Sequence, residues 1–279
     1  SELFTGRGIT DRYELVPGYA LPNAGKGAAE DVWIWLPNAL VTGAKNEIPP
    51  IERIRRSQDV RILKTLVELY HVHELADRGG LPWHVLNHGY ERRQVTERGP
   101  WVIWEFTDKH KDHAKNFEQW LWFKTDLAGK TVSHDDASEA FWNAWRIIQN
   151  AGLIECVEHL VDADTDEGAI IYPCPIATGT DAEQNVGQAA RDAAENMLGE
   201  IMGFVATARG AELGAIQLPV DRAYTTVQMV GVYRLIYRPR TNMTAAWHAR
   251  QFEYEKMAEG FRALAANALD GRPLQNRVG

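Results

Sequence analysis

Hydrophobic residues recur at helical spacing in several segments of the chain. Between Ser57 and Arg78 apolar side chains follow every three or four residues, with Ser57 or Asp59 able to cap the start. The pair Gly79–Gly80 ends this pattern. Similar spacing predicts helices near 109–123, over 138–150, from about 181 to 204 and from about 244 to 269. The last helix carries an apolar stripe that we expect to be core, formed by Trp247, Tyr254, Met257, Phe261, Leu264 and Ala268.

Runs of β-branched and aromatic residues predict strands between these helices. The expected strands cover 31–36, 101–106, 153–161, 169–176, 215–218 and 224–237. The joint from Asp162 to Gly168 has turn composition, so 153–161 and 169–176 are expected to form a hairpin. Cys156 and Cys174 are equidistant from residue 165, and a symmetric hairpin places them opposite one another.

The order of these elements predicts an α+β fold in three regions. An N-terminal arm with one strand covers 1–50, a winged-helix-like domain covers 51–177, and a C-terminal α+β region covers 178–279. Ser133 or Asp135 opens the helix at 138–150 and Ala151–Gly152 stops it, with the hairpin directly after it. In a winged helix, such a helix enters the DNA major groove and the following hairpin is the wing.

The outward side of the 138–150 helix carries side chains that suit base edges. Asparagine and glutamine pair with adenine, and arginine pairs with guanine or a phosphate. Nearby lysines could follow phosphates and make binding depend steeply on salt. The candidate DNA contacts are Asn143, Arg146, Gln149, Asn150, Lys109, Lys111 and Lys115, with Glu139, Lys124 and Lys130 close by. An ordinary solvated helix face is the alternative, because four acids between 108 and 126 offset the lysines.

Composition and charge narrow the class of protein. The 279 residues are 45% hydrophobic, with a formal net charge of -8 and only two cysteines. Two cysteines exclude a disulfide-rich scaffold and a four-cysteine metal site. No apolar run approaches the roughly 20 residues of a membrane helix, and the first residues lack the layout of a secretory signal, so we expect a cytoplasmic protein without membrane contact.

The predicted hairpin is acidic, which argues against a wing that docks on phosphates. It contains no Lys or Arg, and its acids are Glu155, Glu158, Asp162, Asp164, Asp166 and Glu167. We expect it to point away from DNA, toward a basic protein partner, or to keep a strand edge soluble. A calcium loop is rejected, since Gly168 comes one residue late and Pro173 replaces the terminal glutamate. Arg234, Arg238 and Arg240 form a basic strand that either binds phosphate or pairs with local acids.

No cofactor or metal site is expected. Neither His71/His73 nor His110/His113 has the spacing or third ligand of a metal site, and we interpret these histidines as surface or boundary residues. Nine of the ten tryptophans precede residue 146. They favour a core or an interface between copies of the chain over stacking on bases, so a homo-oligomer is expected.

Two parts of the chain resemble winged-helix DNA-binding proteins. In Trp33–Val41, the expected strand ends in Leu36–Pro37 ahead of the helix that begins at Ser57. The second part is the helix-hairpin unit at 138–176. More loosely, the two parts resemble replication initiators of plasmids and prophages. The resemblance implies a non-enzymatic protein of a mobile element that binds double-stranded DNA and self-associates. Two alternatives remain open: an interaction module with a winged-helix shape that does not contact DNA, and an enzyme whose site is assembled from distant residues.

Overall fold

A computed structural model describes residues 36–43, 48–73, 80–81, 86–108, 123–163, 169–202, 214–238 and 245–269. These residues form an α+β fold, as expected, with six α-helices and a six-stranded sheet. The helices are α1 (Asn38–Thr42), α2 (Pro50–Arg55), α3 (Val60–Val72), α4 (His134–Asn150), α5 (Asp181–Met202) and α7 (Ala245–Leu269). The strands are β1 (Asn87–Arg98), β2 (Trp101–Asp108), β3 (Ile154–Asp162), β4 (Ala169–Pro173), β5 (Ile216–Asp221) and β6 (Val227–Leu235).

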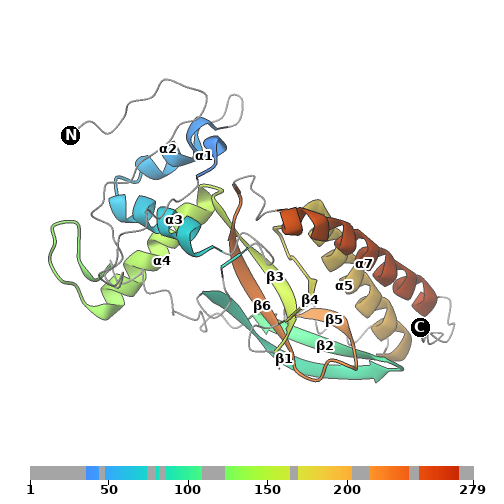
Figure 1. The fold of residues 1–279 in the computed structure, drawn as a ribbon. Helices are drawn as coiled ribbons and strands as arrows, with labels where there is room; N and C mark the ends of the chain where they lie inside the picture. The colour runs from blue at the N-terminus through green and yellow to red at the C-terminus, as the bar shows by residue number, and fades with distance from the viewer. Residues whose placement is uncertain are drawn as a thin grey trace, which may run out of the picture.

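The sheet is antiparallel throughout and has the order β4-β3-β6-β1-β2-β5 (Figure 1). Strand β6 comes late in the chain but lies between β3 and β1. Strands that precede and strands that follow residue 177 are therefore interleaved in one sheet. The β3–β4 hairpin follows α4, as predicted, but β3 also pairs along its whole length with β6. The hairpin is thus part of the sheet rather than a free flap.

The sheet is curled, because its two halves separate along β1. Strand β1 pairs with β6 only over 87–89 and then continues with β2 alone, while the Arg92 guanidinium reaches back to the Val227 carbonyl. At the two edges, the Tyr172 hydroxyl on β4 donates to the Pro219 carbonyl on β5 at 2.8 Å. One hydrogen bond therefore joins the first and last strands of the sheet, giving a half-barrel.

Helices α5 and α7 lie side by side and pack against this curled sheet (Figure 1). The buried side of α5 is rich in alanine, which lets α7 and the strands approach closely. From α7, the Phe261 ring meets the Tyr172 ring edge-on, with centroids 4.9 Å apart. The predicted α7 stripe is confirmed at Tyr254, Phe261, Leu264 and Ala268, which are all buried.

Helices α1 to α4, called the helical module below, pack together at the other end of the sheet (Figure 1). Their shared core includes Leu66 of α3 and Trp145 of α4, together with Ile154 and Leu235, where β3 begins and β6 ends. The Trp145 and Tyr233 rings meet at 87° with centroids 5.1 Å apart. Aromatic contacts of this kind fix α4 to the central strand of the sheet.

Local sequence signals explain where the module helices begin and end. The Asp59 side chain accepts from the Arg61 amide at 2.9 Å, and the Ser133 hydroxyl accepts from the Asp136 amide at 3.1 Å, which caps α3 and α4. Gly152 has φ +67°, where glycine is favoured, and it stops α4 as predicted. Helix α3 ends at Val72 rather than Arg78, because His73 is extended and its imidazole accepts from the Leu235 amide.

The predicted cysteine pairing is wrong. The Cys174 amide donates to the Glu158 carbonyl, so Cys174 lies opposite Glu158, while Cys156 faces Tyr233 on the other side of β3. The pairs next to the turn, Asp162 with Ala169 and Val161 with Ile170, are already offset by one residue from the symmetric register. A bulge on β4 then adds one more residue between the partners of Leu160 and Val161. Both cysteines are free thiols.

Other predictions have mixed outcomes. The strand at 101–106 is confirmed within β2, but its partner β1 was not predicted. The strand expected at 31–36 and the helix near 109–123 fall almost wholly outside the described residues. Strand β5 begins one residue later than expected and continues to Asp221, whereas β6 is shorter than 224–237.

Gly231 lies where β6 passes between Glu158 of β3 and His88 of β1. A Cβ there would sit 2.7 Å from Cys156 Sγ and 2.8 Å from His88 Cβ. We expect Gly231→Ala to lower the free energy of unfolding by about 1–3 kcal/mol through overpacking. Gly260→Ala, on α7 with no atom within 4 Å of its new Cβ, should raise it by about 0.5–1 kcal/mol. Urea denaturation compares the two variants, and equal effects would contradict this account.

Candidate functional site

One side of α4 is buried and the opposite side is exposed, as its sequence predicts. Phe141, Ala144, Trp145 and Ile148 lie in the core of the helical module. Four of the five predicted outward residues are exposed and the fifth is half-buried: Glu139, Asn143, Arg146 and Asn150 are exposed, and Gln149 is half-buried. The structure therefore brings the predicted base-reading residues of this helix together on one surface. Lys109, Lys111 and Lys115 lie outside the described residues.

Two contacts hold the Arg146 side chain along the surface of α4. Its Nη2 donates to the Asn143 side-chain oxygen, and its Nε donates to the Trp142 carbonyl at 3.4 Å. The guanidinium keeps further N–H groups for a ligand, because arginine has five such donors. Arg146 and Asn143 thus form a paired polar group on an exposed helix.

The helical module anchors the C-terminal end of α4 through α2. Arg53 Nη1 donates to the Ala151 carbonyl at 2.9 Å, which satisfies one of the carbonyls that the helix leaves without an internal partner. At the other end, the Asp126 carboxylate accepts from the amides of Ala128 and Lys130 in the turn before α4. The C-terminal end of the candidate helix is therefore held by α2, and the turn that precedes its N-terminal end is held by its own hydrogen bonds.

The acids of the hairpin make internal bonds where they are described. Glu155 bonds to Arg234, and Asp162 accepts from the Thr226 hydroxyl at 2.8 Å. Glu158 is buried and accepts from the Ile176 amide at 3.0 Å. The other three acids, Asp164, Asp166 and Glu167, lie outside the described residues.

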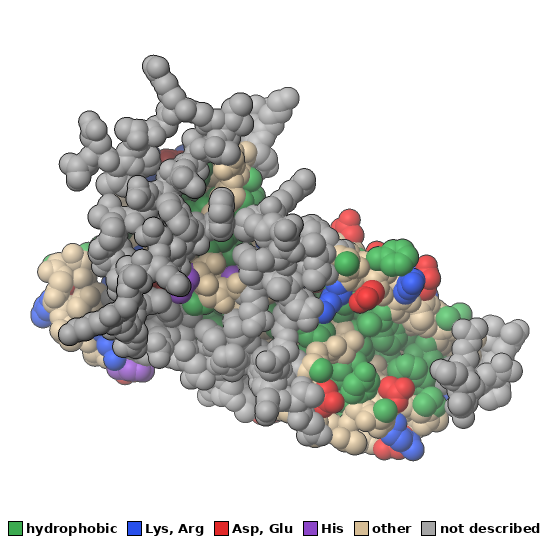
Figure 2. All heavy atoms as spheres, viewed as in Figure 1, with side chains coloured by type: hydrophobic (Ala, Val, Ile, Leu, Met, Phe, Trp, Pro, Cys, Tyr) green, Lys and Arg blue, Asp and Glu red, His purple; other side chains and the backbone are tan. Residues whose placement is uncertain are grey.

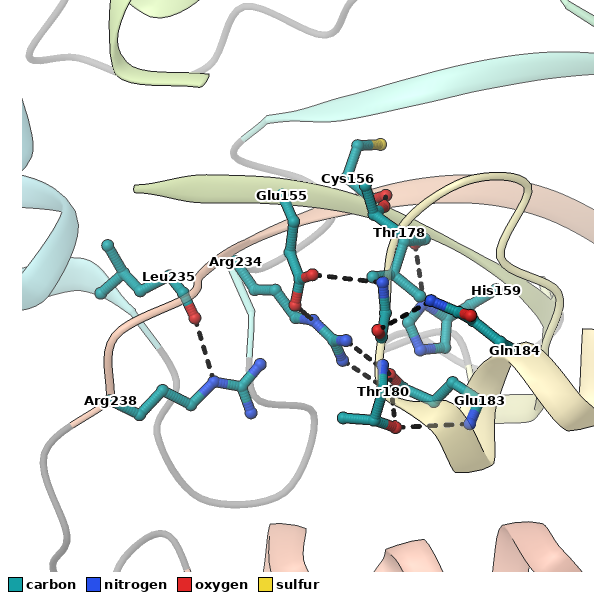
Figure 3. A network of polar contacts seen from close by, with 12 residues as sticks. Glu155, Cys156, His159, Thr178, Thr180, Glu183, Gln184, Arg234, Leu235 and Arg238 are labelled. Carbon is teal, nitrogen blue, oxygen red and sulfur yellow. Dashed lines mark hydrogen bonds and ion pairs between the residues drawn. The ribbon is translucent and has the colours of Figure 1, made fainter. Parts of the chain in front are cut away.

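The most buried charges of the described residues surround Arg234 (Figure 3). Its guanidinium bonds to both carboxylate oxygens of Glu183 and to Glu155, and the Arg234 and Glu183 side chains are 0% and 1% exposed. Burial acts to raise the pKa of Glu183, but the hydrogen bonds and charge of Arg234 outweigh it and lower the pKa to about 2. The sequence allowed the arginines between 234 and 240 either to bind phosphate or to pair with local acids. Arg234 pairs with acids.

Glu183 also caps α5, a role that the sequence signals but that the helix pattern alone did not identify. The Thr180 hydroxyl accepts from the Glu183 amide at 3.3 Å, and the Glu183 carboxylate accepts from the Thr180 amide at 2.7 Å. This reciprocal pair is the capping box that threonine and glutamate form at three-residue spacing. The Glu183 carboxylate therefore caps the N-terminus of α5 and also binds Arg234 of β6.

His73 links the helical module to Leu235 of β6, the residue that follows Arg234. Its Nε2 accepts from the Leu235 amide at 3.0 Å. Burial, followed by the charges of Arg238 and Arg234, lowers the pKa of His73 to about 3, so the imidazole is neutral at ordinary pH. The space beside His73 is too small for a water molecule. It is lined by Leu69, His73, Leu81, Ile154, Arg234 and Leu235. This region is interior rather than a binding pocket.

A second polar group spans β1, β2 and β3. His88 Nε2 lies 2.7 Å from an Asp108 carboxylate oxygen, and the Tyr90 hydroxyl donates to Glu158 at 3.3 Å. Burial raises the pKa of Glu158 despite the hydrogen bonds that its carboxylate accepts. Burial and the Glu158 charge also raise the pKa of the neighbouring Cys156 thiol. The thiol is protonated at neutral pH and is therefore a poor nucleophile.

The histidine pairs show no metal geometry where they are described. His71 is exposed on α3 beside Glu68, whereas His73 is buried with its Nε2 bonded to a backbone amide. His110 and His113 lie outside the described residues. Across the described ranges, no group of three His, Cys, Asp or Glu side chains is placed to hold a metal ion.

No protein-family model, curated protein or solved structure matches the chain. No helix within the described ranges has the length and apolar character needed to cross a membrane.

Arg234→Met tests the buried ion pairs. It should lower the free energy of unfolding by about 3–5 kcal/mol, because Glu183 loses the partner for its buried charge. Arg222→Met is the matched control, since Arg222 pairs with Glu97 on the surface and such pairs contribute at most about 1 kcal/mol. Chemical denaturation measures both variants, and a loss below about 1 kcal/mol for Arg234→Met would contradict the role of this arginine.

Acid should destabilise the protein through its buried histidines. Burial lowers the pKa of His159 to about 4 and that of His73 to about 3, from an ordinary value of 6.5. Between these values the unfolded chain binds protons that the folded protein excludes, so the contribution of these histidines to stability is full above pH 6.5 and is lost as the pH falls toward their folded pKa values. Each histidine contributes a slope of at most about 1.4 kcal/mol per pH unit.

His159→Asn tests this slope by removing one of these two buried histidines. Its free energy of unfolding should fall less steeply than that of the parent between pH 6.5 and 4. His134→Asn, at an exposed position on α4, controls for the loss of an imidazole. Denaturation curves across this pH range measure the slopes, and parallel curves for His159→Asn and the parent would refute the assignment.

Proposed function

We propose that this protein binds double-stranded DNA through the exposed face of α4 and is not an enzyme. The observation that carries the proposal is the placement of Asn143, Arg146 and Asn150 on one exposed face of a helix whose opposite face is locked in a core. The major groove is about 12 Å wide and admits an α-helix. Asparagine suits adenine and arginine suits guanine there.

The helix-hairpin layout supports the same function in a modified form. We infer that the helical module acts as a winged-helix-like unit whose recognition helix is α4. The β3–β4 hairpin pairs with β6 in the sheet, so contact with DNA falls to α4 and its neighbouring helices rather than to the hairpin. The internal bonds of Glu155, Glu158 and Asp162 agree with a hairpin that does not approach phosphates.

On the face of α5 and α7 that Figure 2 shows, basic side chains do not gather into one patch. Figure 2 shows acidic, basic and apolar side chains mixed over this side. Strong nucleic-acid surfaces concentrate basic side chains on one face. We therefore assign DNA contact to the helical module and leave α5 and α7 a structural role.

Arg146→Ala should weaken binding to duplex DNA by roughly 5- to 150-fold, the range expected for the loss of one base-reading side chain. Fluorescence anisotropy at several salt concentrations measures the change, with a duplex that the parent protein selects from a random-sequence pool. Arg222→Ala, an exposed arginine just after β5 on the sheet, is the control and should bind as the parent does.

Two results would overturn the proposed function. Parent protein that fails to bind duplex DNA at low salt would favour the interaction module without DNA contact. Equal affinities of Arg146→Ala and the parent would show that α4 does not read DNA, even if another surface binds it. Far-UV circular dichroism of each variant confirms that the fold is retained, since Arg146 is exposed and outside the core.

A further inference from the structure

Charge is distributed unevenly along α4. The exposed residues of its first turns include Asp135, Asp136 and Glu139, whereas no acidic residue occurs from 140 to 150. The N-terminal part of the helix therefore repels phosphate, and its C-terminal part does not. This polarity is the reverse of the usual docking, in which the first residues of a recognition helix contact base edges.

Helix α2 places further arginines at the C-terminal end of α4. The bond from Arg53 to the Ala151 carbonyl fixes α2 beside this end and offsets the negative pole of the helix dipole there (Figure 1). Arg55, the last residue of α2, and Arg56, which follows it, have side chains that are 78% and 62% exposed. Exposed arginines beside the end of a helix that enters a groove can contact the DNA backbone next to that groove.

Within the described residues 48–56, one acidic side chain accompanies these arginines. Glu52 bonds to Arg55 at 2.6 and 2.8 Å and lies 4.0 Å from Arg56. Over this range, positive charges therefore outnumber negative ones. At the opposite end of α4, Lys124 and Lys130 accompany Asp126 and the acids of the first turn. Among the described residues, the α2 end is therefore the more basic end of the module.

We propose that α4 meets duplex DNA with its C-terminal half and that Arg55 and Arg56, at the end of α2, bind the flanking phosphates. This inference rests on the proposed function and adds the direction of docking and a second DNA-binding element. Asn143, Arg146 and Asn150 then face the bases, while Asp135 and Asp136 stay outside the groove. The turn before α4, with Lys124 and Lys130, lies on the side that faces away from the duplex.

The test compares two double variants that each remove two positive charges from the helical module. Arg55→Ala/Arg56→Ala should lower the slope of log affinity against log salt by roughly one unit per arginine and weaken duplex binding at 0.1 M salt by roughly tenfold or more. Lys124→Ala/Lys130→Ala should leave the slope close to that of the parent. Glu52→Gln should tighten binding by roughly a few-fold, a gain that misfolding cannot produce.

The outcomes separate this inference from the proposed function. If the parent binds duplex DNA and Arg146→Ala weakens binding, but the arginine variant keeps the parental slope, the function stands and the docking inference fails. A larger slope loss in the lysine variant would indicate docking by the N-terminal half of α4. Tighter binding to single-stranded DNA than to the duplex would also overturn groove docking, and a parent without DNA affinity would overturn both proposals.

Discussion

The Arg234 guanidinium is a charge inside the protein, and its two carboxylate partners determine how the rest of the chain is assembled around β6. Burying an ion is costly unless it is paired and fully hydrogen-bonded. Glu155 pairs with it from the adjacent strand and Glu183 from the first turn of α5. Because Glu183 also caps α5, one cluster fixes the start of a helix, the neighbour of a strand and the position of β6. The next residue, Leu235, binds His73 at the end of α3, so the helical module joins the same strand.

This arrangement explains why α4 can present a fixed polar face. The helix rests on Tyr233 through Trp145, and Arg53 holds its C-terminal carbonyl, so its position follows that of the sheet. A recognition surface on a rigid element loses little conformational freedom when it binds. The same coupling carries a consequence for mutagenesis. Changes near Arg234 would disturb α4 without touching DNA, and stability must therefore be measured alongside affinity.

Local features of the fold could be predicted from the sequence, and long-range features could not. Spacing and caps located α4, its stop at Gly152 and the stripe of α7, because helices are built from contacts three and four residues apart. Strand β1 was missed, since its run of charged and polar residues between His88 and Arg98 lacks apolar alternation. It is a strand because β2 and β6 pair with it. The cysteine register failed for a related reason, because an asymmetric turn and a bulge each move the pairing by one residue.

The overall composition was a poor guide to the charge of the protein surface. A net charge of -8 and an acidic hairpin argued against DNA, yet Glu155 and Glu158 are bound within the protein. A carboxylate that is buried and paired contributes little to the field outside the molecule, and an incoming polyanion responds to the local surface. The face of α4 could be predicted because helix periodicity shows which side is outward. The arginines of α2 could not, because the contact between Arg53 and Ala151 joins residues 98 positions apart. The surface to which we assign DNA contact is therefore a product of tertiary packing.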